Sequence, residues 1–288
     1  MVSVMEGNWV SLSVTSPPIV TRDIPPSLGP VMTELELDAP EVVTMAELAA
    51  LVERYGIGTD PKVVAGRLRA RGWLLSTGIR GVWEFAPAAH AGPISHGDPY
   101  LPVRAALAGH PGLPLAVCLI SALRAHGLAE RAPDLLEVAV PTGTSVPAGL
   151  RRRARVVIFE ANLFPQLFDG VPVHVPATVL VHLAARPADV RGWGAIADTL
   201  ADLVARADVT EIDRELEGRP RSVRVRLAYL TQGVAPDLAD RLVPPEEGGR
   251  TAPKVWFGPR GTLKRHNTRF SVADTVLPFD PADLRPDQ

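Results

Sequence analysis

The densest group of residues suited to binding a polyanion lies between Asp60 and Pro87. This stretch is DPKVVAGRLRARGWLLSTGIRGVWEFAP, and its apolar spacing changes from helical to alternating after a glycine. Five of its residues are basic and two are acidic, whereas the whole chain of 288 residues has a formal net charge of -2. A local basic cluster on a slightly acidic chain is typical of a surface that meets a negatively charged partner such as DNA.

A helical wheel of residues 61–71 separates the basic side chains from the apolar ones. Val64 and Leu68 share the face expected to pack inward. The candidate DNA-binding residues are Lys62, Gly66 and Arg69 on the opposite face, Arg67 and Arg71 at its rim, and Thr77 and Arg80 in the following hairpin. Arginine can pair with guanine in the major groove, and any of these cations can meet a phosphate. The alternative is an ordinary solvated face, because basic residues late in a helix also favour its dipole.

Local signals predict the elements that would position these side chains. Thr44 and Glu47 have the spacing of a capping box, and Asp60-Pro61 is a second helix start. Gly72 ends that helix, and the runs WLL and GVWEF then flank STGIR, which is typical of a short hairpin. With a further short helix before Pro40, residues 32–88 are predicted to form a winged helix-turn-helix.

The remainder of the chain predicts a tail, a linker and a larger second domain. Residues 1–31 are proline-rich and are expected to be a disordered or loosely docked tail, and residues 89–102 are expected to be a linker. Residues 103–288 alternate between strand-like runs such as LLEVAVP and ARVVIFEA and helical runs such as GWGAIADTLADLVAR. The predicted fold class is therefore α+β, with an N-terminal winged helix-turn-helix followed by a mixed domain.

Cysteine content and hydropathy exclude several classes of protein. Cys118 is the only cysteine and lies in an apolar run, so neither a disulfide framework nor a cysteine metal cluster is possible. No apolar run is long enough for a membrane span, and the first thirty residues lack the pattern of a signal peptide. We expect a cytoplasmic protein.

The sequence contains none of the common catalytic motifs. G-x-S-x-G, Walker A, H-E-x-x-H and G-x-G-x-x-G are missing, and no D-x-D pair is available to hold the metal ions of a nucleotidyltransferase. The seven histidines are scattered and are interpreted as structural. We therefore expect no enzymatic activity, no cofactor and no metal. The run RRRAR at 151–155 is either a solvated loop or a secondary nucleic-acid contact.

A second basic region lies near the C-terminus. Its cations are Arg250, Lys254, Arg260, Lys264, Arg265 and Arg269, with no acidic residue between the first and the last. Trp256, Phe257 and His266 alternate with these charges, a mixture that suits a phosphate-tracking surface or an acidic protein partner. A solvated strand-and-loop surface is the alternative.

Five short motifs, in this order, resemble the AbiEi-type antitoxins of bacterial toxin–antitoxin and abortive-infection systems. They are VTMAELAAL (43–51), RLRARGWL (67–74), RGVWEF (80–85), SALRAHGL (121–128) and LEVAVP (136–141). The resemblance implies a winged helix that represses its own operon, a larger domain required for antitoxin activity, and a nucleotidyltransferase-like toxin as partner. The proline-rich start and Trp83, where the family often has tyrosine, depart from the pattern.

The sequence thus favours a DNA-binding transcriptional regulator that acts on its own promoter as an antitoxin. Two alternatives stay open. One is an antitoxin that acts only through protein interaction, and the other is an RNA-binding protein that uses the C-terminal basic region.

Overall fold

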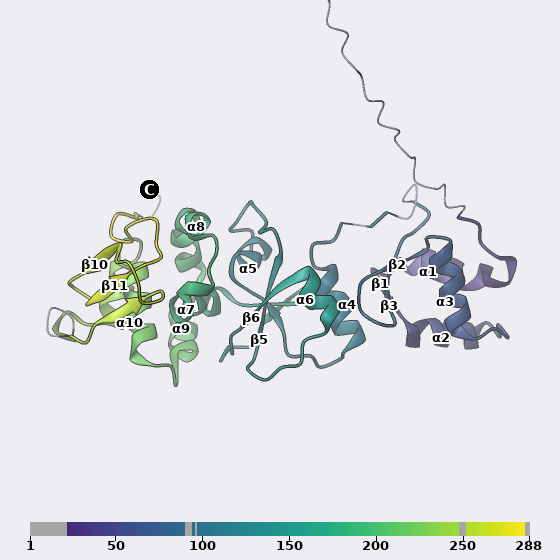
Figure 1. The fold of residues 1–288 in the computed structure, drawn as a ribbon, viewed down its shortest axis with the longest axis horizontal. Coiled ribbons are helices and arrows are strands. Elements are labelled where there is room, and N and C mark those ends of the chain that lie inside the picture. Colours follow the sequence, from purple (N-terminus) through teal and green to yellow (C-terminus); the bar gives the residue numbers. More distant parts are fainter. Residues whose placement is uncertain (1–21, 90–93, 96, 248–251, 286–288) are drawn as a thin grey trace, which may run out of the picture. The chain divides into compact units, whose positions relative to one another are not determined.

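The protein is described by a computed structural model that covers residues 22–89, 94–95, 97–247 and 252–285 (Figure 1). These residues form two compact units. One holds the described residues up to Leu75 and those from Glu84 to Ser95, and the other holds Ser76–Trp83 and those from Gly97 onward. Helices and strands are mixed in both, which confirms the predicted α+β composition. No helix in the described part of the chain has the length and hydrophobicity to cross a membrane.

Residues 22–89, the described part of the N-terminal segment, contain three α-helices and three short strands. Its elements are η1 (Pro26–Leu28), α1 (Gly29–Asp38), β1 (Val42–Thr44), α2 (Met45–Arg54), α3 (Pro61–Ala70), β2 (Leu74–Ser76) and β3 (Val82–Phe85). The strands form a sheet in the order β1-β3-β2. Leu48, Val64, Leu68 and Phe85 are fully buried in its core. The predicted sequence of helix, turn, helix and hairpin is therefore present.

Side-chain caps explain where α2 and α3 begin. The Thr44 hydroxyl accepts a hydrogen bond from the Glu47 backbone N–H, and the Glu47 carboxylate accepts one from the Thr44 N–H at 2.7 Å. Asp60 accepts a bond from the Lys62 N–H at 2.7 Å, and Pro61 occupies the first helical position. Because these signals are local, they were recognisable from the sequence.

The packed structure begins earlier than the predicted boundary at residue 31. Leu28 and Val31 are fully buried, and the Arg22 guanidinium lies 4.1 Å from the centroid of the Trp73 ring. The Trp73 indole also donates a hydrogen bond to the Asp23 carbonyl. The prediction of a loose tail is thus wrong for residues 22–31, because their apolar side chains complete the first core. Residues 1–21 of the predicted tail lie outside the described residues.

The second unit is built around a five-stranded sheet and a group of helices (Figure 1). Its first elements are α4 (Leu101–Gly109), β4 (Ala116–Val117), α5 (Leu119–Ala125), β5 (Leu136–Val140), α6 (Ala148–Arg153), β6 (Ala154–Ile158), β7 (Gln166–Phe168) and β8 (Val171–Val173). The strand order is β6-β5-β4-β8-β7, with β5 parallel to β6 and β4 parallel to β8.

Helices α7 to α11 and a second sheet complete this unit. Their bounds are α7 (Pro176–Ala185), η2 (Pro187–Asp189), α8 (Trp193–Arg206), α9 (Val209–Leu216), α10 (Arg221–Thr231), α11 (Pro236–Leu242), η3 (Pro245–Glu247), β9 (Val255–Phe257), β10 (Arg265–Asn267) and β11 (Val272–Asp274). Eight consecutive residues of α7, from Ala177 to Ala184, are buried. Helix α7 is therefore the centre around which α8, α9 and α10 pack.

One apolar run divides into a strand and a helix. The run AVCLISALRAHGL (116–128) has the pattern of a single helix, but Ala116 and Val117 form β4 and the helix starts at Leu119. Val117 pairs with both Val138 and Val173, so β4 lies between two other strands. Sheet pairing from distant parts of the chain therefore overrides the local helical pattern.

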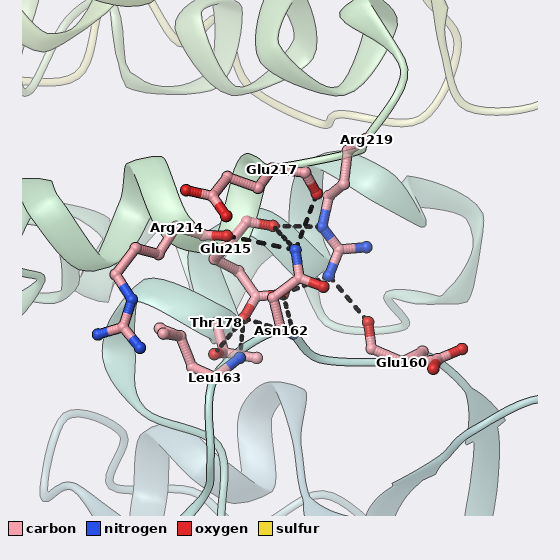
Figure 2. Close-up of polar contacts among 8 residues, drawn as sticks. All are labelled: Glu160, Asn162, Leu163, Thr178, Arg214, Glu215, Glu217 and Arg219. Carbon is pink, nitrogen blue, oxygen red and sulfur yellow. Dashed lines mark hydrogen bonds and ion pairs between the residues drawn. The ribbon is translucent and has the colours of Figure 1, made fainter.

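A buried carboxylate joins three segments of the second unit (Figure 2). Glu215 is fully buried and accepts hydrogen bonds from the Asn162 and Leu163 backbone N–H groups, each at 3.1 Å, and from the Thr178 hydroxyl at 2.9 Å. It also forms an ion pair with Arg219. The Asn162 side chain in turn donates to backbone carbonyls at the end of α9. A fully satisfied buried network of this kind specifies how the segments fit together.

Candidate nucleic-acid interface

Helix α3 exposes most of the residues predicted to bind DNA. Val64, Ala65 and Leu68 are buried on its inner side, whereas Lys62, Gly66, Arg67 and Arg69 are exposed. None of these three cations forms an ion pair with an acid in the described part of the chain. A Cβ atom built on Gly66 would meet nothing within 4 Å. The exposed face of α3 thus carries positive charges without acidic partners among the described residues, and Gly66 lies among them.

Arg71 has a different environment from the other predicted cations. It is only partly exposed, and its Nε donates to the Asp23 carboxylate at 3.0 Å. Arg71 also occupies the C-cap position of α3. Because the charge is already paired within the fold, Arg71 is better placed to hold residue 23 than to meet a ligand.

The position of Thr77 at the hairpin tip contradicts one predicted DNA contact. The Thr77 side chain is only 1% exposed, and its hydroxyl donates to the Val82 carbonyl at 2.7 Å. The prediction that Thr77 binds DNA is therefore wrong, because this side chain closes the turn from inside. Arg80 is exposed, as a ligand contact requires. The tip also packs against α6, where a Cβ on Gly149 would lie 2.2 Å from the Gly78 carbonyl oxygen.

The RRRAR run lies partly beside this tip. Arg151, Arg152 and Arg153 form the exposed last turn of α6, and Arg153 donates to the Ser76 carbonyl at 2.9 Å. Arg155, in contrast, lies on β6 and pairs with the buried Glu137 at 2.7 Å. The run is therefore helix and strand and not a loop, and Arg152 and Arg153 lie beside the tip.

The C-terminal basic region is mostly committed to internal contacts. Arg265 pairs with the buried Asp274 at 3.1 Å and donates to the Leu277 carbonyl at 3.0 Å. Arg269 pairs with Asp240, and Lys264 donates to the Val276 carbonyl. The remaining members are Lys254, which stacks on the Trp256 ring at 4.8 Å, Arg260, which is exposed, and Arg250, which lies outside the described residues. This region is therefore less of a free cationic surface than its sequence indicates.

Other titratable groups are buried for structural reasons. His182 stacks on Phe159 with ring centroids 3.9 Å apart, and neither of its ring nitrogens has a hydrogen-bond partner among the described residues. Burial lowers the pKa of His174 to about 4 and the pKa of His182 well below its ordinary value, with Arg219 adding to both effects. Nowhere in the described chain do three histidine, cysteine or acidic side chains gather as metal ligands would.

A comparison with protein families finds a match within the second unit. Residues 115–232 match the family described as the AbiEi antitoxin C-terminal domain. This match confirms the resemblance to AbiEi-type antitoxins and supports the role of antitoxin in a toxin–antitoxin pair.

A solved structure is similar over most of the chain. It is the crystal structure of the RV2827C protein from Mycobacterium tuberculosis, with 27% sequence identity and a TM-score of 0.76. The similarity covers 90% of this chain and 94% of that chain. No curated protein matches the chain.

Proposed function

We propose that this antitoxin also binds DNA and represses its own operon through residues 32–88, acting as a winged helix-turn-helix. The observation that supports this most strongly is the exposed face of α3, where Lys62, Arg67 and Arg69 have no acidic partner among the described residues. A helix of this kind fits the major groove, and its cations can neutralise phosphates.

The individual residues of α3 have distinct proposed roles. Arg69 has the donor geometry to pair with guanine O6 and N7, so it would contribute sequence preference. Lys62, at the start of the helix beside its N-terminal dipole, is suited to a phosphate. Gly66 lies between them along the exposed face and would allow the helix backbone to approach the groove closely.

A second set of cations supports phosphate binding beside the hairpin. Arg80 at the tip and Arg151–Arg153 on α6 are exposed, and the Arg153–Ser76 hydrogen bond holds these two parts together. We propose that they meet the DNA backbone without sequence preference. This proposal replaces Thr77 by the α6 arginines as contacts near the tip.

The partner proposed for the second unit is a nucleotidyltransferase-like toxin, as the family resemblance implies. The chain itself is proposed to act by binding and not by catalysis. Incubation with magnesium, labelled nucleotides and RNA should therefore produce no label transfer. Transfer that persists through purification to homogeneity would contradict this part of the proposal.

The test of DNA binding is a gel-shift titration of the full chain on its own promoter. Lys62→Ala combined with Arg69→Ala should weaken binding by roughly tenfold or more, because each base or phosphate contact contributes about 1 kcal/mol or more. Arg214→Ala is the control for loss of one positive charge elsewhere, since this exposed arginine lies on α9. Unchanged affinity in a double variant with wild-type circular dichroism would refute the assignment of α3.

An antitoxin that works only through protein contacts is the second candidate. It is favoured by two exposed apolar side chains. Leu167 on the outer strand β7 is 67% exposed, and Phe164, which precedes β7, is 92% exposed. Exposed apolar side chains on an edge strand suit a protein partner. Loss of toxin neutralisation in Phe164→Ser with promoter binding intact would show that this surface has a function separate from DNA binding.

A further inference from the structure

A pocket in the second unit gathers four arginines. Arg219 precedes α10, Arg221 and Arg224 lie on its first turns, and Arg241 lies on α11. The buried side chains of Leu242 and Val243 line the same pocket, whose volume is about 450 Å³. Sites for small molecules commonly have volumes of about 300–1,000 Å³. The hollow is therefore large enough for a small ligand and is lined mainly by positive charge.

Two of these arginines are held in place by carboxylates outside the pocket. Arg219 pairs with the buried Glu215, and its guanidinium also donates to the Glu215 and Glu160 carbonyls at 2.6 Å and 2.8 Å (Figure 2). No hydrogen bond to a described residue involves its Nη1. Arg241 pairs with Asp213. Neither Glu215 nor Asp213 lines the pocket. Such fixed guanidinium groups bind an anion with little further loss of conformational freedom.

The other two arginines are less firmly paired than Arg219 and Arg241. Arg224 is exposed and forms no ion pair or side-chain hydrogen bond with any described residue. Arg221 lies 3.8 Å from the carboxylate of Glu247, which is the only acidic residue lining the described part of the pocket. Guanidinium forks bind phosphate oxygens in pairs, and the uncapped N-terminus of α10 adds to the positive potential. The guanidinium groups and the helix N-terminus thus favour an anion that carries phosphate groups.

We propose that this pocket is a binding site for a soluble ligand with several phosphate groups, of the size of a nucleoside di- or triphosphate. Four arginines line one hollow, whereas a nucleic-acid backbone presents its phosphates one after another along a ridge. The apolar side chains of Leu242 and Val243 offer a contact for a sugar or base. This site is separate from α3 and does not depend on the proposed DNA binding.

The test is isothermal titration of the full chain with ATP and, separately, with inorganic triphosphate. Both should bind, and the variant Arg221→Ala with Arg224→Ala should weaken each by roughly tenfold or more, because it removes two charge-assisted contacts. The control Arg214→Ala removes one positive charge from α9, outside the pocket, and should keep the affinity within about twofold. Arg224→Lys should recover part of the loss relative to Arg224→Ala, since lysine retains charge but lacks the fork.

Three results would overturn the proposal. The first is that neither ligand binds the wild-type chain, and the second is that the double variant binds both as tightly as the wild type. The third is that a duplex of unrelated sequence displaces ATP at similar phosphate concentration, which would make the pocket part of a nucleic-acid surface. If the double variant does not fold, the single variant Arg224→Glu gives the same comparison, because Arg224 has no partner in the described structure.

Discussion

At the scale of single residues, Gly66 on α3 bears on the proposed DNA contact as much as the charged residues around it do. Gly66 costs helix stability, yet its backbone is helical and a Cβ there would be unobstructed. Packing within the protein therefore does not explain the glycine. Close approach of a DNA groove would explain it.

Gly66→Ala separates these two roles of the residue. The free energy of unfolding should rise by about 0.5–1 kcal/mol, because alanine is the better helix former in an exposed helix. Promoter binding should weaken if the groove approaches this backbone. Urea denaturation and gel shift on the same preparation provide the two measurements. A more stable variant with unchanged affinity would show that Gly66 is not at the interface.

Buried histidines give the protein a sensitivity to acid. The folded-state pKa of His174 is about 4, below its ordinary value, so the unfolded chain takes up a proton first as the pH falls. Stability is fully present above pH 6.5 and is lost as the pH falls towards 4. For a group shifted this far, the loss between pH 7.5 and pH 5 is about 2 kcal/mol.

Replacing His182 should reduce this acid sensitivity. The pKa of His182 is lowered by burial and by the nearby His174, Arg219, Arg186 and Arg155, so His182→Leu should flatten the dependence of stability on pH. Urea midpoints at pH 7.5 and pH 5 measure the effect, and exposed His110→Gln is the control. An equal loss of stability in His182→Leu and wild type would show that this histidine is not responsible.

At the scale of elements, an ion pair between Arg265 and Asp274 connects two strands of the β9–β11–β10 sheet. In the sequence, Arg265 looks like one of several surface charges. Asp274 on β11 is fully buried and contacts Arg265 on the neighbouring β10 as well as the Tyr229 hydroxyl of α10 at 3.2 Å. Asp274 also accepts bonds from the Val276 and Leu277 N–H groups. The β9–β11–β10 sheet is thus tied to α10 through one carboxylate.

Arg265→Ala should destabilise this part of the chain by about 3–5 kcal/mol, because it leaves a buried carboxylate without its cation. Urea denaturation measures the loss. Arg260→Ala, in the same basic region but exposed, should stay within about 0.5 kcal/mol of wild type. Equal stability of the two variants would contradict a structural role for Arg265. Tests of partner binding should therefore use Arg260 and leave Arg265 intact.

At the scale of the whole molecule, the number of phosphate contacts can be estimated from how DNA affinity depends on salt concentration. Lys62, Arg67, Arg69 and Arg80 are exposed without an acidic partner in the described residues. Each neutralised phosphate contributes a logarithmic slope of about -0.9 to the salt dependence, so these four contacts by themselves account for about -4.

The α6 arginines should add to this slope if they also lie on DNA. A wild-type slope steeper than about -4 that returns towards this value in Arg151→Ala with Arg152→Ala would place α6 on the backbone. Fluorescence anisotropy at several salt concentrations provides the measurement. This pair leaves Arg153, and its bond to Ser76, in place. A slope near zero in the wild-type chain would contradict DNA binding altogether.

The sequence by itself determined the features that depend only on residues close together along the chain. Thr44, Glu47 and Asp60 define helix starts through caps within three residues, and the spacing of Val64 and Leu68 defines which side of α3 is exposed. Only the tertiary structure decided features that depend on distant residues. Thr77 is buried, Arg71 and Arg265 are paired, and Ala116–Val117 is a strand because segments far away in the sequence pack against them. The arginine pocket has the same origin, because its lining comes from separate helices that meet only after folding.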